Sequence, residues 1–213
     1  MDNAIEGAYR TGAASGLIAG VVAGSGTNGH LWACRWNLPA ATLLTDKRRI
    51  AVIQRLRVKA TTVAGYTAAQ EVRLSLWKLT GYTVAHSGGT GAAVLTPSQK
   101  YTGQPAALMA GRIAGSDQLT AGTQVLDTDP IGGCSWPELA TGAAVPKGPG
   151  GEIFMSTEDL LQHPLILVSG EGLLVRNEVA QGAAGSLRLV VEMDWLELQR
   201  YPVGTFQIAR AVI

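Results

Sequence analysis

The sequence of 213 residues is poor in charged residues, aromatic residues and cysteines. Charged residues make up 15% of the chain, below the quarter or so that is usual in soluble domains. Two cysteines are too few for a disulfide framework, and Cys34 and Cys134 stand too far apart for a zinc site. We therefore expect two free, mostly buried thiols, which fits assembly in a reducing cytoplasm.

Long apolar runs and a strong net charge are also missing. The apolar stretch Gly16–Gly24 has about half the length that a bilayer span needs. The opening MDNAIEGAYR carries two acids and one arginine, whereas a secretory signal has a basic region there. A formal net charge of +1 gives no overall attraction to nucleic acid or anionic lipid. We expect neither a membrane nor a nucleic-acid partner, and we interpret residues 1–29 as a flexible Gly/Ala-rich arm.

Alternation of apolar and polar residues is the clearest pattern that is present. It is strongest near the C-terminus and predicts a long strand with one buried and one solvated face. The face expected to be buried carries Leu187, Leu189, Val191, Met193 and Trp195, and the opposite face carries Arg188, Glu192 and Asp194.

Five more segments carry strand patterns. A short aromatic strand is expected at His30–Pro39. The segments RRIAVIQRLRVKATTV and AQEVRLSLWKL alternate as well, with Ile50, Val52 and Leu56 on one face of the first and Gln54 as the exception. The glycine turn between these two segments predicts an antiparallel hairpin, and the turn SGEG predicts a second hairpin that joins 165–168 to 173–179.

Closely spaced strands without amphipathic helices indicate an all-β fold. We predict an antiparallel β-sandwich, jelly-roll-like, with a Gly/Ala-rich N-terminal arm and long Pro/Gly loops. The arm covers residues 1–29 and a single sandwich domain covers 30–213. Within this domain, residues 96–161 form a long loop region, where TDPIGGCSWPELATGAAVPKGPGGE is dense in proline and glycine. Loops of that length are usually functional or ordered by a partner.

One serine has neighbours that permit a catalytic hypothesis. Ser87 in AHSGG stands at a sharp strand-to-loop turn, and Asp127 or Asp129 with His163 follow in an order that a serine hydrolase allows. However, the first glycine of a nucleophile elbow is replaced by Ala85, and the α/β context is absent. An ordinary turn explains the segment better, and we expect no enzyme.

Other motifs are explained by structure alone. The loop SGGTG lacks the Lys-Ser/Thr of a phosphate-binding loop, and the three histidines show no metal-ligand spacing. A basic row of Arg55, Arg57 and Lys59 resembles a nucleic-acid stripe. Because acids are expected at similar outward positions on neighbouring strands, cross-strand charge pairs are the better interpretation. No cofactor or metal is expected.

Exposed aromatic residues and prolines are the best candidates for an interface. Trp77 falls on the polar side of its strand, and Trp136 lies in the long loop beside Pro137 and close to Pro130. Tryptophan is enriched among the residues that dominate binding energy. We therefore predict interface contacts at Trp77, Trp136, Pro130 and Pro137.

Two blocks of the sequence resemble structural proteins of tailed bacteriophages. The first, RRIAVIQRLRVKATTVAGYTAAQEVRLSLWKLTGYTVAHSGGTGAAVL, contains a basic-apolar strand, a TAAQE hairpin and an SGGT loop. The second, HPLILVSGEGLLVRNEVAQGAAGSLRLVVEMDWLEL, ends in a strand with an acid-Trp pair. Together the blocks cover roughly 80 of the 213 residues. The shared motifs are structural, so the resemblance supplies no catalytic residues.

The resemblance implies a non-enzymatic virion protein, most plausibly a capsid decoration or cement subunit. Such a subunit would bind the lattice of the major capsid protein at the capsid surface, as a homo-oligomer with a trimer favoured, after synthesis in the host cytoplasm. Two alternatives stay open. One is a tail, baseplate or fibre-associated virion subunit. The other is a carbohydrate-binding sandwich, for which Trp77, Trp136, Tyr82 and Tyr101 are the available aromatic residues.

Overall fold

The fold is seen in a computed structural model that describes residues 5–22, 24, 28–37, 49–120, 122–140, 150–156, 164–182 and 184–199. All regular elements in these ranges are strands. They are β1 (Ile5–Ala14), β2 (Ile18–Ala19), β3 (His30–Trp36), β4 (Arg49–Ala64), β5 (Gln70–Val84), β6 (Ala93–Val94), β7 (Ser98–Gln99), β8 (Met109–Ile113), β9 (Thr123–Leu126), β10 (Gly132–Glu138), β11 (Gly151–Ser156), β12 (Leu165–Leu167), β13 (Glu171–Asn177) and β14 (Ser186–Gln199). No helix long and apolar enough to cross a membrane occurs in the described part of the chain.

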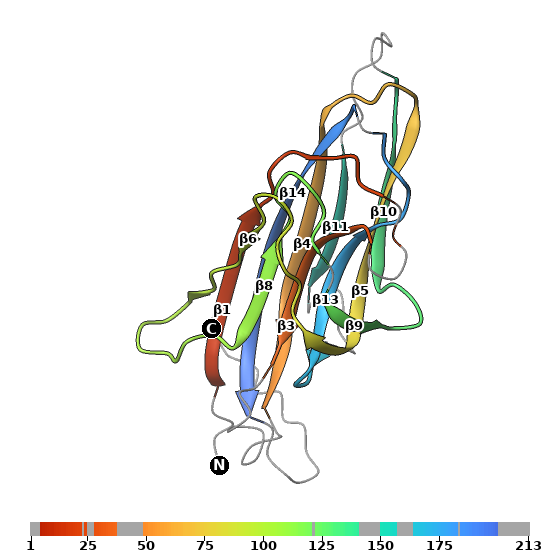
Figure 1. The fold of residues 1–213 in the computed structure, drawn as a ribbon. Coiled ribbons are helices and arrows are strands. Elements are labelled where there is room, and N and C mark those ends of the chain that lie inside the picture. Colours follow the sequence, from red (N-terminus) through yellow and green to blue (C-terminus); the bar gives the residue numbers. More distant parts are fainter. Residues whose placement is uncertain are drawn as a thin grey trace.

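The strands form two seven-stranded antiparallel sheets, which pack as a β-sandwich (Figure 1). Sheet A has the order β11-β4-β14-β1-β7, and β12 and β2 pair with β4 and β14 beside this path. Sheet B has the order β10-β5-β13-β3-β8-β6, with β9 also paired to β5. The predicted all-β sandwich is therefore confirmed.

The chain crosses repeatedly from one sheet to the other. In sheet A, β14 lies between β1 and β4, and in sheet B, β13 lies between β3 and β5. The chain changes sheets, for example, between β2 and β3, between β4 and β5, and between β13 and β14. This wrapping gives the fold its jelly-roll-like character.

Both predicted hairpins are wrong because of this wrapping. The strands at 49–64 and 70–84 do not pair with each other; β4 pairs with β14 and β5 pairs with β13. Likewise β12 pairs with β4, whereas β13 belongs to the other sheet. A turn between two alternating segments shows that the chain reverses, but a reversal over the edge of a sandwich has the same sequence signature as a hairpin.

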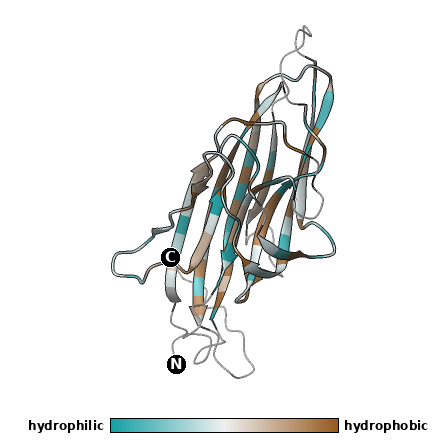
Figure 2. Cartoon of the chain, in the orientation of Figure 1, coloured by the Kyte–Doolittle hydropathy of each residue, from teal (hydrophilic) through white to brown (hydrophobic). Residues whose placement is uncertain are grey.

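The core lies between the sheets and is built from apolar residues of both. Figure 2 shows hydrophobic and hydrophilic residues interspersed along the strands. The pattern predicted for the last long strand is confirmed in β14: its five apolar residues from Leu187 to Trp195 are buried, while Arg188 is exposed. Trp195 stacks on Tyr9 of β1 with ring centroids 5.6 Å apart. This contact ties the first strand of the chain to the last.

A β-bulge at Gln54 explains the break in the pattern of β4. Arg55 pairs with Asp194, but the next paired residues are Ile53 and Trp195, so Gln54 has no partner across the strands. The extra residue reverses which side chains face the core. Ile53 therefore shares the buried face with Leu56, which corrects the expectation that Val52 does so.

The N-terminal segment differs from the expected flexible arm over residues 1–29. Ile5–Ala14 forms β1, which lies between β14 and β7 inside sheet A. Tyr9 is fully buried there, and its hydroxyl donates a hydrogen bond to the carbonyl of Pro105. The alanine and glycine residues of β1 are not typical strand residues, so the sequence pattern did not predict a strand here. Small residues can nevertheless pack closely on a neighbouring strand.

The expected long loop at 96–161 also contains regular structure. Strands β8, β9, β10 and β11 all lie in it, and β10 pairs with β5 over the whole length from Gly132 to Glu138. Proline and glycine made this segment look irregular. Because β10 is at the edge of sheet B, Pro137 is tolerated there.

Candidate functional site

The outer face of sheet A carries paired charges, as the sequence predicted. Asp194 on β14 binds Arg55 on β4 at 3.0 Å and Lys100 at 3.4 Å. Beside it, Arg57 binds Glu152 of β11 at 2.9 Å, and this hydrogen bond lowers the pKa of Glu152 below its ordinary value. The basic row is therefore largely matched by carboxylates, as a solvated sheet surface requires.

A denser polar cluster surrounds Trp77 on sheet B. The guanidinium of Arg176 lies over the indole ring, 4.5 Å from its centroid, and forms two hydrogen bonds of 3.0 Å with Glu178. The Trp77 indole N–H donates to Glu178 at 2.9 Å, and the Ser75 hydroxyl donates to the same carboxylate. Burial alone would raise the pKa of Glu178, but the hydrogen bonds from Arg176, Ser75 and Trp77 lower it.

This cluster shows what the sequence did and did not reveal about Trp77. The residue is half-buried on the outer side of β5, as predicted, but one ring face is covered by Arg176. The partners Arg176 and Glu178 are two residues apart at the end of β13, a spacing that places them on one side of the chain. That spacing was the signal available in the sequence. Only the pairing of β13 with β5 brings Arg176 and Glu178 to Trp77.

The other predicted interface residues lie at the edge of sheet B. Pro130 and Pro137 are exposed, and their interface role stays a prediction. Trp136 is different, because only 3% of its surface is exposed and its indole N–H donates to Glu138 at 2.8 Å. The expectation of an exposed loop tryptophan is wrong. Trp136 belongs to β10 and packs its ring in the core between the sheets.

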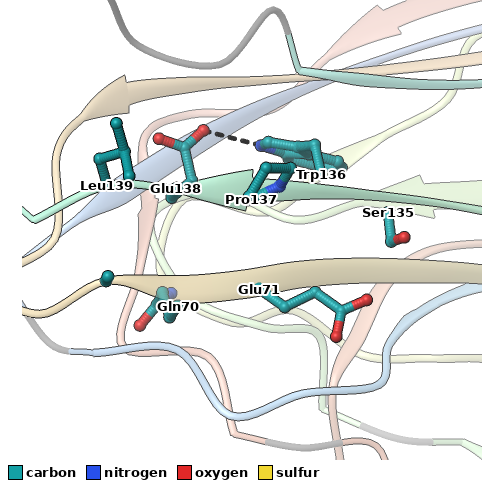
Figure 3. Close-up of a pocket in the computed structure, with 8 residues that line it drawn as sticks. Gln70, Glu71, Ser135, Trp136, Pro137, Glu138 and Leu139 are labelled. Carbon is teal, nitrogen blue, oxygen red and sulfur yellow. Dashed lines mark hydrogen bonds between the residues drawn. The ribbon is translucent and has the colours of Figure 1, made fainter. Parts of the chain in front are cut away.

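A shallow pocket with a volume of about 520 Å³ opens beside Trp136 at the ends of β10 and β5. Figure 3 shows Trp136 and Glu138 on one side of β10, joined by their hydrogen bond, with Ser135 and Glu71 on the other side. Gln70 and Leu139 complete the end of the pocket near the strand termini. No local pattern in the sequence indicates this pocket, since the pocket depends on the pairing of Glu138 with Gln70.

Two histidines form a buried cluster beneath the loop that follows β5. His30 Nδ1 and His86 Nε2 are 2.7 Å apart, and the other ring nitrogen of His86 is hydrogen-bonded to the Tyr82 hydroxyl. Burial, aided by His30, lowers the pKa of His86 to about 3. His86 is therefore neutral at physiological pH, and a structural role explains its position.

The proposed triad around Ser87 finds no support in the described residues. The ring of the adjacent His86 is turned to His30 and Tyr82, and the Asp127 carboxylate accepts a hydrogen bond from the Thr128 amide. His163 lies outside the described residues. Ser87 itself forms an antiparallel bridge with Thr120, as a turn residue would.

Within the described ranges no group of three or more histidine, cysteine or acidic side chains is placed to hold a metal ion. Cys34 and Cys134 are free thiols, as predicted, and burial raises their pKa values to about 12 and about 11. Neither thiol is in an environment that would activate it as a nucleophile.

Comparison with known proteins does not assign a family. No protein-family model matches the sequence, and no curated protein matches it significantly. Among solved structures, the chain is similar to one from the full particle of Israeli acute paralysis virus heated to 63 degrees. That match has a TM-score of 0.25 and 10% identity, and it covers 97% of this chain and 75% of the viral chain. At this TM-score the likeness supports no argument about function.

Proposed function

We propose that this chain is a non-enzymatic structural subunit of a tailed-phage virion, specifically a decoration or cement protein that binds the lattice of the major capsid protein. The observation that carries the proposal is the resemblance of the two sequence blocks to phage structural proteins. In the fold these blocks pair with each other twice, through β4 with β14 and β5 with β13. They therefore form one framework, as blocks inherited from a single structural family should.

The mechanism under this proposal is mass action. A subunit that binds the assembled lattice, and not the free capsid protein, stabilises the assembly by its binding free energy without any turnover. Closed cyclic symmetry, with a trimer favoured, would let several modest contacts act together. The framework would hold the exposed loops and sheet edges in place, and these would contact the capsid lattice.

The edge of sheet B near Pro130 and Pro137 is the surface we assign to this contact. Both prolines are exposed, and Val125 of the neighbouring β9 has 62% of its surface exposed. Rigid apolar residues at a surface lose little conformational entropy when a partner covers them. The resemblance supplies no contact residues, so this assignment rests on exposure alone.

Light scattering and co-sedimentation test the proposal. We expect a homotrimer in size-exclusion chromatography with light scattering, and saturable co-sedimentation with purified phage heads that lack the protein. Pro130→Glu combined with Pro137→Glu should weaken co-sedimentation at least tenfold. The matched control is Val94→Glu, an exposed position on β6 at the opposite edge of the same sheet. A monomer that ignores the heads would contradict the proposal.

The tail or baseplate alternative would appear in the same experiment as binding to tails but not to heads. The carbohydrate alternative has less support than the sequence suggested. Of its four aromatic residues, Tyr82 and Trp136 are buried, with 2% and 3% of their surfaces exposed. Tyr101 is 66% exposed, but among the described residues it forms no ring contact with the half-buried Trp77.

A further inference from the structure

The pocket at the ends of β10 and β5 contains a buried carboxylate without a cation. Only 2% of the Glu138 surface is exposed, and its side chain accepts one hydrogen bond, from the Trp136 indole N–H. Among the described residues, no lysine or arginine forms an ion pair with it. A buried carboxylate with one neutral donor loses more hydration than it recovers, so this position is costly unless another group binds there.

A second polar group, the side-chain amide of Gln70, lies across the strand pair from Glu138. Its N–H donor has no hydrogen-bond partner among the described residues. Gln70 and Glu138 are partners in the ladder between β5 and β10, which places their side chains on the same face of the sheet. The Gly182 amide donates to Gln70 Oε1 at 3.0 Å, and this contact fixes the orientation of the side-chain amide. The Nε2 donor then has no partner within the described chain.

The two groups require complementary chemistry from a ligand. Glu138 requires a cationic donor, and Gln70 Nε2 requires an acceptor. A lysine or arginine residue in a peptide carries both, because its charged side chain and its backbone carbonyl belong to the same residue. The apolar rim formed by Pro137 and Leu139, the latter 41% exposed, would contact the methylene groups of such a side chain.

We propose that the pocket beside Glu138 and Gln70 binds a lysine or arginine side chain of a partner protein. In this site the basic side chain would neutralise Glu138. The backbone carbonyl of the same lysine or arginine residue would accept a hydrogen bond from Gln70 Nε2. A charge-assisted hydrogen bond in a shielded site is among the stronger single contacts that a protein surface can offer. This inference does not depend on the virion role, because it concerns only the class of group that the pocket recognises.

A titration with a minimal ligand tests the proposal directly. Nα-acetyl-lysine N-methylamide is added to the ¹⁵N-labelled full chain, and the indole N–H signal of Trp136 reports on the pocket; a Trp136→Phe variant identifies this signal. We expect a saturable shift with a millimolar dissociation constant. The probe Nα-acetyl-norleucine N-methylamide, which lacks the amine, should bind at least tenfold more weakly. Equal shifts with the two probes would overturn the proposal.

Two variants separate the buried carboxylate from general surface charge. Glu138→Gln keeps the size of the side chain and an oxygen that accepts from Trp136, so it should fold, and we expect at least a tenfold loss of lysine affinity. Glu71→Gln removes an exposed carboxylate from the same pocket and should change the affinity less than threefold.

The proposal fails if Glu138→Gln binds the lysine probe as well as the unaltered chain, or if Glu71→Gln causes the larger loss. Folding of each variant is checked by the dispersion of the five tryptophan indole signals. Should Glu138→Gln not fold, the comparison of lysine and norleucine probes on the unaltered chain decides the question alone.

Discussion

Close packing between the two sheets makes single residues near their shared edge sensitive to added volume. A Cβ atom placed on Gly151 of β11 would lie 2.5 Å from Trp136 Cε3 and 2.7 Å from Cys134 Sγ. Both of these neighbours belong to β10 of the opposite sheet, so the glycine lets the two edges approach. The Trp136 ring is 3% exposed and packed in the core, so it has little room to move away from an added methyl group.

We therefore predict that Gly151→Ala destabilises the protein by about 1–3 kcal/mol, because an extra methyl group overpacks this contact. Urea unfolding followed by tryptophan fluorescence measures the change. The matched control is Gly12→Ala on β1, where an added Cβ meets nothing within 4 Å. Equal stability of the two variants would show that the edges are not in close contact.

The buried histidine cluster predicts a pH dependence of stability. The pKa of His86 is about 3 in the folded chain and about 6.5 when unfolded, so between these values the unfolded state binds more protons. Its contribution is fully present above pH 6.5 and is lost as the pH falls toward 3. The groups that face it are His30 and Tyr82.

Between pH 7.5 and pH 4.5 this loss should reach roughly 2–3 kcal/mol. Urea unfolding of the unaltered chain and of His86→Phe at both pH values isolates the effect from that of the carboxylates. We expect the variant to lose that much less stability on acidification. Parallel pH profiles for the two proteins would mean that the imidazole is not buried as described.

At the scale of strands, Asp194 of β14 binds Arg55 of β4 at 3.0 Å and Lys100, the residue after β7, at 3.4 Å. Its side chain is 15% exposed, so solvent screens it less than its neighbours. We predict that Asp194→Asn lowers the free energy of unfolding by about 1 kcal/mol at low salt, the sum of two modest ion pairs. Chemical denaturation gives the value.

The control for this prediction is Glu192→Gln on the same strand. Glu192 is 41% exposed and lies 3.9 Å from Arg57, so its replacement should have no measurable effect. In 1 M NaCl the difference between the two variants should shrink, since salt screens the more exposed basic partners of Asp194. An effect of Asp194→Asn that persists undiminished in high salt would argue against an electrostatic origin.

Strands show which parts of the structure could be predicted. Period-2 alternation identified the long strands and the buried face of β14, because it reports on burial alone. It did not identify partners, and so the reversal after β4 was taken for a hairpin although β4 and β5 lie in different sheets. The alternation also failed at Gln54, because the β-bulge there changes which of the following side chains face the core.

The candidate sites were harder to predict than the fold, for a related reason. Trp77 was singled out from its position on the polar side of β5, but the residues that cover it come from β13. The pocket at Glu138 needs Gln70 across the ladder and Gly182 to orient it. Such sites arise from contacts between distant segments, and a sequence read as separate segments does not contain them.

At the scale of the whole molecule, the N-terminal segment contains a strand of sheet A, β1, where the sequence predicted a flexible arm. This strand lies between β14 and β7, pairs with β14 from Ile5 to Ala14, and places Tyr9 against Trp195 in the core. Removing it would expose the edge of β14, which is long and apolar on its inner face. An edge of that kind is prone to aggregate.

We predict that a variant lacking residues 1–14 loses cooperative thermal unfolding and elutes as aggregates in size-exclusion chromatography. A variant lacking only residues 1–4 removes no part of β1 and serves as the control. Circular dichroism melts of both variants distinguish a central strand from a detachable arm. If the shorter protein melted cooperatively as a well-behaved oligomer, β1 would be an accessory to sheet A, and the expected flexible arm would describe the N-terminal segment better.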